Sequence, residues 1–232
     1  MRVLIIGHRG ASAYYPENTL LAIRKAIEMG ADIIEVDIRL SRDRYPVVIH
    51  DETLDRTTNG KGPVSMYTLS ELKSFNAGLG EKIPSLEEVL RYFQNIDKVL
   101  FLELKEIGAT DKSLELVRKY DLLNRTYFIS FHIKALQRLN KLDQKVNLGL
   151  LYSSPDKWIN LAVKLKCKAI LPKYTITTKK VVKQAHREGL EVFTWTIDDP
   201  KRAVKYARIG VDGIATNKPD ILIKALADEG FR

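Results

Sequence analysis

Residues 34–51 decide the fold and read Ile-Glu-Val-Asp-Ile-Arg-Leu-Ser-Arg-Asp-Arg-Tyr-Pro-Val-Val-Ile-His-Asp. Glu35 and Asp37 lie two residues apart in an apolar, β-branched run, so a strand places both carboxylates on one face. Val36 and Ile38 then face a packed layer on the other side. Two adjacent carboxylates repel each other and need a cation or a shared proton. A turn at 41–45 and the apolar run 46–49 bring His50 nearby, which predicts carboxylates and an imidazole at the ends of buried strands.

The composition is that of an ordinary globular protein, because 45% of the 232 residues are hydrophobic and 29% are charged. The 38 Lys and Arg against 29 Asp and Glu give a net charge of +9, which can attract nucleic acid, anionic membrane or small phosphorylated substrates. Basic and acidic residues alternate along the predicted helices, and no long Lys/Arg run is present. We interpret the excess as solvated helix faces with a modest bias toward anionic ligands, and expect no nucleic-acid partner.

Cys167 is the single cysteine, which excludes an intrachain disulfide and a cysteine-based metal cluster. The apolar run 3–6 is too short for a signal peptide core or a membrane span. We therefore expect a cytoplasmic protein without stable membrane insertion. The sequence does not predict the oligomeric state.

Apolar β-type runs alternate with helical patterns along the whole chain. Strands are expected at 3–6, 33–40, 46–50, 99–104, 127–131, 148–152, 169–171, 191–197 and 212–216. Helices are expected at 20–30, 86–93, 113–120, 134–142, 155–165, 179–188, after 199–200, and at 219–227. If the hairpin 33–50 counts as one position, eight strands are each followed by a helix. This α/β pattern predicts a single TIM (β/α)8 barrel domain over residues 1–232, in preference to an open doubly wound sheet.

Residues 51–84 interrupt this rhythm and predict a small insertion after the second strand. Turn-forming residues fill 51–63, and only 69–75 has a weakly helical pattern. Such a long loop in a compact domain is usually functional. TIM-barrel active sites lie at the carboxyl ends of the strands, where this chain places polar groups: 7–9, 50–51, 103–105, Trp195 and Asn217.

Glu35, Asp37 and Glu103 are three carboxylates on apolar strands, and a hard divalent cation prefers such oxygen ligands. The alternative is that they form salt bridges with nearby Arg or Lys. Because Glu103 lies on the next barrel strand after the Glu-x-Asp pair, we favour a metal site.

His8 and His50 both end strands, and imidazoles there are suited to moving protons near neutral pH. A single histidine at a strand end is more often structural, but two at the same end of a barrel favour catalysis. His132 and His186 are interpreted as structural.

Arg9 and Lys105 are cations beside these groups, as a phosphate site requires. They could equally pair with the carboxylates, and both roles can hold together. Trp195 could contact an organic group or simply fill the barrel mouth. Asn18 is expected to do no more than cap the following helix.

Several segments together resemble the glycerophosphodiester phosphodiesterase family, in order and nearly end to end. They are Gly-His-Arg-Gly-Ala at 7–11, Pro-Glu-Asn-Thr at 16–19, Glu-Val-Asp at 35–37, His-Asp-Glu-Thr-Leu-Asp-Arg-Thr-Thr-Asn-Gly at 50–60, Pro-Ser-Leu-Glu-Glu-Val-Leu at 84–90, Leu-Glu-Leu-Lys at 102–105, Thr-Trp-Thr at 194–196 and Gly-Val-Asp-Gly-Ile at 210–214. One departure is Asn217, where many members carry Asp. We expect this change to touch none of the catalytic set.

The resemblance implies a TIM barrel and the metal-dependent hydrolysis of glycerophosphodiesters to glycerol 3-phosphate and an alcohol, in glycerol and lipid metabolism. It implies that His8 and His50 are the acid–base pair, with the two roles unassigned. It also implies that the three carboxylates bind Mg²⁺ or Ca²⁺, with Mn²⁺ as an alternative, and that Arg9 and Lys105 contact phosphate. Trp195 is added as a candidate substrate contact.

Two other functions remain open. A lysophospholipase D on the same scaffold would need an apolar groove, for which the insertion offers Tyr67, Leu69, Leu72 and Phe75, although these could merely pack the loop. A non-catalytic anion-binding barrel, such as a nucleic-acid binder, would use the positive charge. The histidine pair and the carboxylate triad favour an enzyme.

Overall fold

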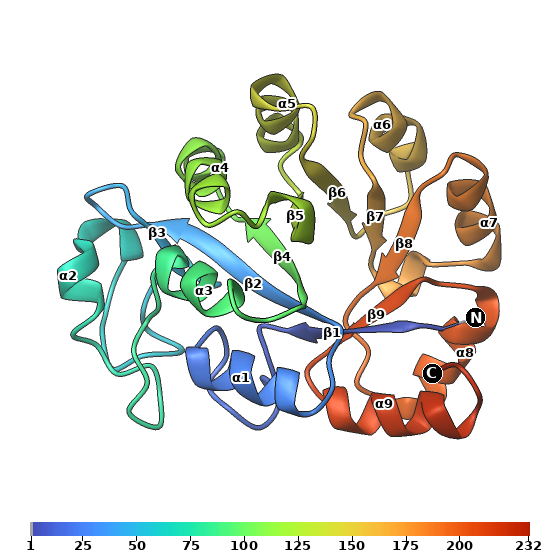
Figure 1. Cartoon of the computed structure of the whole chain (residues 1–232), viewed down its shortest axis with the longest axis horizontal. Helices are drawn as coiled ribbons and strands as arrows, with labels where there is room; N and C mark the ends of the chain where they lie inside the picture. Colours follow the sequence, from blue (N-terminus) through green and yellow to red (C-terminus); the bar gives the residue numbers. More distant parts are fainter. Residues whose placement is uncertain (1) are drawn as a thin grey trace.

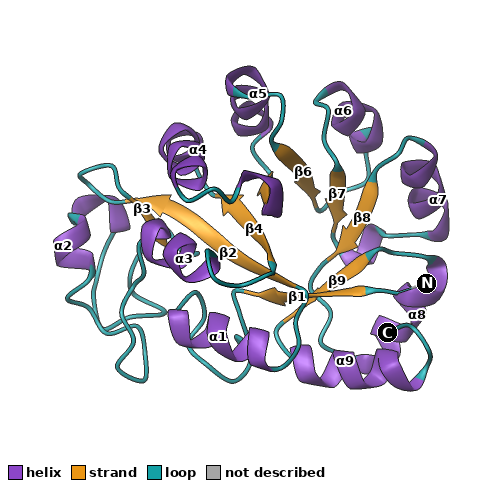
Figure 2. Ribbon diagram, viewed as in Figure 1, coloured by secondary structure: helices purple, strands orange, loops and turns teal. Residues whose placement is uncertain are grey.

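The computed structural model describes residues 2–232 and contains a closed ring of eight parallel strands with helices around it (Figures 1 and 2). The ring closes because β1 (Leu4–His8) pairs with both β2 (Ile33–Leu40) and β9 (Gly213–Thr216). The other strands of the ring are β4 (Val99–Leu104), β5 (Thr126–Ser130), β6 (Asn147–Tyr152), β7 (Ala169–Pro172) and β8 (Glu191–Thr194). The expected TIM barrel is therefore confirmed.

β3 (Pro46–Val48) pairs antiparallel with the end of β2 and lies outside the ring, so the hairpin occupies one barrel position as expected. It ends two residues before His50, and β8 ends at Thr194 instead of 197. Both strands end early because their backbone pairing with the neighbouring strand ends at these residues, and the chain continues as loops at the barrel mouth.

Eight helices form the outer layer. They are α1 (Leu20–Glu28), α3 (Leu86–Phe93), α4 (Thr110–Lys119), α5 (Ile133–Leu142), α6 (Trp158–Lys164), α7 (Lys179–Arg187), α8 (Pro200–Ile209) and α9 (Pro219–Asp228). Most begin where the sequence predicted, but α4 begins at Thr110 instead of 113 and α6 at Trp158 instead of 155. Ser85 and Glu88 form the expected capping box of α3, and Asp199 caps α8. None of the helices within residues 2–232 combines the length and apolarity needed to cross a bilayer.

The strands bury two different layers. Val36 and Ile38 pack outward against the helices, whereas Ile33 and Phe101 belong to the smaller cluster inside the barrel. Since side chains alternate along a strand, Glu35 and Asp37 share the inward face with Ile33. The alternation that the sequence predicted for residues 33–38 therefore aims both carboxylates into the barrel.

The insertion shares a small core with the preceding hairpin, formed by Val47, Ile49, Leu54, Val64, Leu72, Ala77 and Ile83. Its regular elements are a 3₁₀ turn, η1 (Val64–Met66), and the one-turn helix α2 (Leu69–Leu72). Tyr67 and Phe75 pack edge to face at 5.2 Å between ring centroids, and Leu69 and Phe75 pack against the small core. Of the two roles considered for these side chains, the contacts support packing of the loop, and none of the four lines the central pocket.

Candidate functional site

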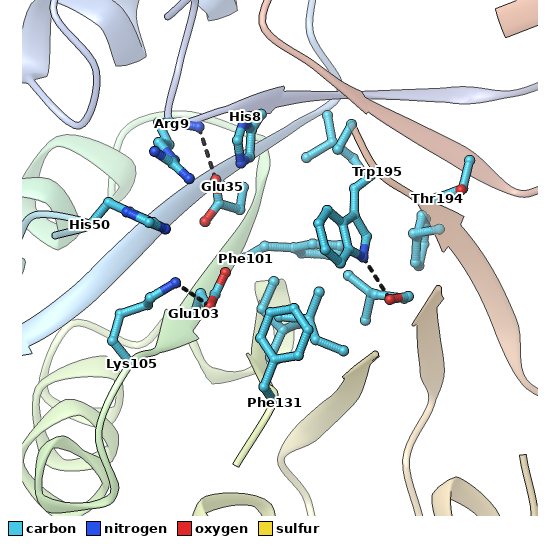
Figure 3. Close-up of a pocket in the computed structure, with 16 residues that line it drawn as sticks. His8, Arg9, Glu35, His50, Phe101, Glu103, Lys105, Phe131, Thr194 and Trp195 are labelled. Atoms are coloured by element: carbon cyan, nitrogen blue, oxygen red, sulfur yellow. Dashed lines mark hydrogen bonds and ion pairs between the residues drawn. The ribbon is translucent and has the colours of Figure 1, made fainter. Parts of the chain in front are cut away.

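Strand register assembles the three carboxylates. His8 on β1 pairs with Glu35 on β2, and Asp37 on β2 pairs with Glu103 on β4. One oxygen from each of Glu35, Asp37 and Glu103 lies within 4.8 Å of the other two, and all three side chains are buried. Figure 3 shows Glu35 and Glu103 pointing into the pocket between His8, His50, Arg9 and Lys105. The residues proposed from the sequence therefore meet at the carboxyl end of the barrel.

The two neighbouring cations compensate the triad only in part. Lys105 Nζ lies 2.6 Å from Glu103 Oε1 and 3.4 Å from Asp37 Oδ1, and Arg9 Nε lies 3.2 Å from Asp37 Oδ2. The salt-bridge alternative thus holds for Asp37 and Glu103. Glu35 Oε2 accepts only the Arg9 backbone N–H at 2.9 Å, and Glu35 Oε1 is buried with no hydrogen-bond donor among residues 2–232.

The chemistry of this donor set fits a divalent cation. When all three carboxyls are ionised, the two cations leave one negative charge and a buried oxygen without a partner, and an uncompensated buried charge is strongly destabilising. Oxygen-only ligation is typical of Mg²⁺ and Ca²⁺. The buried triad is therefore compatible with a divalent metal site.

Burial and mutual repulsion separate the acidities of the three carboxyls. Burial, then the charges of Asp37 and Glu103, raise the pKa of Glu35 well above its ordinary value. Burial and the charge of Asp37 raise the pKa of Glu103 to about 7. Burial would also raise the pKa of Asp37, but Arg9 and Lys105 outweigh it and hold that pKa below its ordinary value. Asp37 is therefore the permanent anion of the cluster.

The loop after β1 is shaped by close backbone packing. Gly10 has φ +80°, and a Cβ there would lie 2.5 Å from the carbonyl carbon of Ala22 at the start of α1. Arg9 has φ +57°, in the same left-handed region. This turn directs the Arg9 N–H to Glu35 and the Arg9 guanidinium to Asp37.

Asn18 does not cap α1. Thr19 is the N-cap, and its hydroxyl accepts the Ala22 N–H. Asn18 has φ +60° and is buried, where its Nδ2 donates to Asp37 Oδ2 at 2.8 Å and its Oδ1 accepts the Asp37 N–H at 3.2 Å. The capping role expected for Asn18 is wrong, because the amide instead fixes the orientation of the Asp37 carboxylate.

His8 is held by a residue at the far end of the chain. Its Nδ1 lies 2.8 Å from Asn217 Oδ1, which also accepts the Ser12 hydroxyl, while Asn217 Nδ2 donates to Asp198 Oδ2 at 2.8 Å. Because an amide oxygen only accepts, His8 carries its proton on Nδ1 and presents a free Nε2. Burial, followed by the charge of Arg9, lowers the pKa of His8. The expectation that Asn217 would touch none of the catalytic set is therefore wrong.

A chain of ion pairs that the sequence reasoning missed holds His50. Asp51 Oδ1 lies 2.6 Å from His50 Nδ1, and Arg56 makes two hydrogen bonds to Asp51 and two to Glu17. Glu17 then accepts from Arg9 Nη1 at 2.9 Å. Arg56 thus bridges the carboxylate that orients His50 and the one that orients Arg9. The sequence signal for Asp51 and Arg56 was their place in the motif at 50–60, and for Glu17 its place in the motif at 16–19. No sequence motif pointed to Asp198.

Trp195 forms part of an apolar wall opposite the charged groups, together with Phe101 and Phe131 (Figure 3). Its indole N–H donates to the Leu171 carbonyl at 2.7 Å, and its ring meets Phe131 edge to face at 5.6 Å. Trp195 therefore offers the pocket only an apolar surface. His132 contacts the Lys105 carbonyl and His186 pairs with Asp212, in agreement with the structural roles expected for both.

Known proteins share this fold and sequence pattern. Residues 8–221 match the model of the glycerophosphoryl diester phosphodiesterase family. A glycerophosphodiester phosphodiesterase of Caldanaerobacter subterraneus is 35% identical over 99% of this chain and 100% of its own length. A phosphodiesterase of Oleispira antarctica, solved with the product sn-glycerol-3-phosphate, is 30% identical with a TM-score of 0.91 over 97% of this chain and 96% of its own.

A glycerophosphodiester phosphodiesterase of Thermotoga maritima is 33% identical with a TM-score of 0.83, over 97% of this chain and 98% of its own. The matches extend over nearly the whole chain. They include His8, His50 and the two strands that carry the carboxylates. The resemblance read from the motifs is confirmed, and the chain belongs to the glycerophosphoryl diester phosphodiesterase family of enzymes.

Proposed function

We propose that this enzyme hydrolyses glycerophosphodiesters to glycerol 3-phosphate and an alcohol. The observation that carries the proposal is the meeting of two histidines, each bonded through Nδ1, with a carboxylate triad flanked by Arg9 and Lys105. The product named for the Oleispira relative supports glycerol 3-phosphate as the product here.

Charge balance in the pocket supports a phosphodiester monoanion as substrate. Glu35, Asp37 and Glu103 would hold one Mg²⁺, Ca²⁺ or Mn²⁺, and the ion would supply Lewis-acid polarisation of phosphate oxygens. The triad, its two cations and a divalent ion together carry one positive charge, which the substrate neutralises. Arg9 and Lys105 are already fixed by ion pairs, so they can stabilise developing charge without reorganising.

Proton transfer would fall to the histidines. Both use Nδ1 for their orienting contacts, His8 to Asn217 and His50 to Asp51, which leaves Nε2 of each ring for the reacting oxygens. One ring would take the proton of the attacking oxygen and the other would give a proton to the leaving alkoxide. Because its lowered pKa keeps His8 neutral near pH 7, we propose His8 as the base and His50 as the acid.

Trp195 and Phe131 would contact the carbon atoms of the substrate and exclude water from that side of the pocket. This wall comes from the barrel, and not from the insertion. It could also accept a lysolipid, so the lysophospholipase D alternative is tested alongside the main proposal.

A substrate panel tests the function directly. After chelation and re-addition of Mg²⁺, Mn²⁺ or Ca²⁺, we expect metal-dependent release of glycerol 3-phosphate from glycerophosphocholine and glycerophosphoethanolamine, measured by an enzyme-coupled assay. Turnover restricted to lysophospholipids would favour the alternative. No turnover of any diester with any ion would contradict the enzyme function.

Metal-induced stabilisation is expected to grow with pH. The raised pKa values of Glu35 and Glu103 mean that protons compete with the cation at low pH. In the metal-free protein, protonated Glu35 and Glu103 contribute stability that is full below pH about 4.5. This stability is lost as pH rises through about 7, the pKa of Glu103, because the folded state keeps protons that the unfolded chain has already released. At a free ion concentration of about 100 times Kd, the Tm increase should reach about 5–10 °C.

Thermal melts with EDTA or saturating Mn²⁺ at several pH values between about 5 and 8 measure this increment. We expect it to be small near pH 5 and full near pH 8. An increment that is the same at all pH values, or larger at low pH, would contradict metal binding by this triad.

Arg56 is expected to act as a positioning residue for His50 and Arg9. Arg56→Ala should lower kcat about 10–100-fold, by analogy with the loss of residues that orient metal ligands. Arg56→Lys should recover little, since an ammonium group cannot form two bidentate pairs. Arg42→Ala is the matched control, because Arg42 contacts Glu71 and the Met66 carbonyl on the surface of the same region and lies outside the pocket. Equal kcat for wild type and Arg56→Ala would show that the bridge is only structural.

A further inference from the structure

The positive charge of the chain is concentrated in one segment. Residues 156–208 contain 13 Lys and Arg but 5 Asp and Glu, so they carry +8 of the total +9. This segment forms α6, α7 and α8, which are consecutive on the barrel wall (Figure 1). The interpretation that basic and acidic residues alternate along all helices is therefore wrong for this side of the molecule.

We define the basic flank as the cations of this segment: Lys157, Lys164, Lys166, Lys168, Lys173, Lys179, Lys180, Lys183, Arg187, Lys201, Arg202, Lys205 and Arg208. All except Lys173 are exposed. Among the ion pairs formed by residues 2–232, only that of Arg208 with Glu229 involves one of these cations. Elsewhere, exposed cations commonly have partners, such as Lys112 with Glu115 and Lys119 with Glu87.

The few acids of the segment are mostly committed to other contacts. Asp199 caps α8, Asp198 holds Asn217, and Glu191 accepts from the Tyr127 hydroxyl. Asp156 and Glu188 are exposed among the cations. Five acids against 13 cations leave the flank with a large net positive charge facing solvent.

The chemistry of the flank favours a fluid anionic surface over a nucleic acid. Ten of its 13 cations are Lys, whose flexible ammonium groups act as point charges. The planar guanidinium group of Arg is better suited to bidentate hydrogen bonds with fixed phosphates and bases. Single-stranded nucleic-acid sites also use open aromatic faces for stacking, but Arg202 covers the ring of Tyr174 at 4.8 Å. Clusters of Lys and Arg bind anionic phospholipid by electrostatic attraction alone.

The flank also reaches the catalytic end of the barrel. Lys173 follows β7, Lys179 is the first residue of α7, and Lys201 lies in the first turn of α8. Helices of a TIM barrel begin near the carboxyl ends of the strands. A surface that contacts the flank therefore lies beside the pocket mouth.

We propose that the basic flank docks this enzyme reversibly on bilayers that contain anionic phospholipid. The attachment is peripheral and electrostatic, so it weakens as salt shortens the range of the field. It does not depend on the proposed reaction, because none of these cations belongs to the pocket.

Vesicle co-sedimentation tests the proposal. We expect binding to vesicles of phosphatidylcholine with about 30% phosphatidylglycerol at about 0.05 M NaCl, and none to phosphatidylcholine alone. The triple variant Lys183→Gln/Lys201→Gln/Lys205→Gln should bind the anionic vesicles at least about tenfold more weakly. The control Lys25→Gln/Lys112→Gln/Lys119→Gln removes the same charge from cations that already have partners, and should change binding less than about twofold.

Three outcomes would overturn the proposal. The first is absence of wild-type binding to anionic vesicles at low salt. The second is equal weakening in both triple variants, which would assign the attraction to net charge and not to this face. The third is binding to a mixed-sequence RNA oligonucleotide that vesicles fail to displace, which would make the flank a nucleic-acid surface. Melting curves check folding, and the three single variants replace the triple if it unfolds.

Discussion

Replacing either histidine with alanine is expected to lower kcat by about 10²–10⁴-fold on a glycerophosphodiester, the usual contribution of a positioned proton-transfer group. Melting temperatures should change little, because both rings are only partly buried at the barrel mouth. The double variant should lose less than the product of the two single losses, since both rings serve one reaction. His186→Ala is the matched control, because this ring lies outside the pocket and pairs with Asp212.

The roles of the two rings can be separated with a substrate that has an acidic leaving group, such as a nitrophenyl ester. Such a group departs without a proton, so the ester should rescue the variant that lacks the acid and not the one that lacks the base. With His8 neutral near pH 7, we expect rescue of His50→Ala. At a metal concentration kept saturating at each pH, activity should persist on the acid side to below pH about 6.5, the ordinary histidine value, because the pKa of His8 is lowered. Near wild-type rates for both single variants would show that the histidines are structural.

Glu35→Gln is expected to weaken metal binding and lower activity strongly while making the metal-free protein more stable. The amide keeps the shape of the side chain but removes a buried charge next to Asp37 and Glu103. Metal affinity should fall at least about 100-fold, because loss of an outer partner alone costs about 10–100-fold. Isothermal titration calorimetry and melts in EDTA measure the two effects, and Glu87→Gln, an acid outside the pocket, is the control.

Opposite changes in stability and activity would distinguish a functional cluster from a structural one. If the triad served only as the centre of a salt-bridge network, Glu35→Gln would lower the melting temperature and leave kcat unchanged. Full activity of wild type in EDTA with no bound metal would exclude a catalytic ion.

His8 Nδ1 contacts the amide of Asn217, whereas His50 Nδ1 contacts the carboxylate of Asp51, and this difference affects the pKa of His8. A neutral amide fixes the tautomer of His8 without adding negative charge, whereas a carboxylate at that position would favour the protonated ring. The neutral amide of Asn217 therefore agrees with the lowered pKa of His8. Asp198 contacts Asn217 and not His8, so its negative charge is further from the ring and its hydrogen bonds orient the Asn217 amide.

Local patterns in the sequence were sufficient to predict the barrel and the centre of its site. The two-residue spacing of Glu35 and Asp37 in an apolar run predicted a shared inward face, because side-chain alternation is a property of any strand. The β/α rhythm then predicted that the end of each strand reaches the same rim, which placed His8, His50 and Glu103 together. These inferences needed no knowledge of contacts between distant residues.

Only the tertiary structure decided which partners hold those groups. His8 meets Asn217 across 209 residues because ring closure sets β1 beside β9, and Arg56 reaches Glu17 because the insertion folds back over the loop after β1. Asn18 resembled a helix cap in sequence, yet a left-handed backbone turned its amide to Asp37. Hydrogen-bond partners such as these depend on strand register and loop path, which are set by packing of the whole chain and not by local propensity.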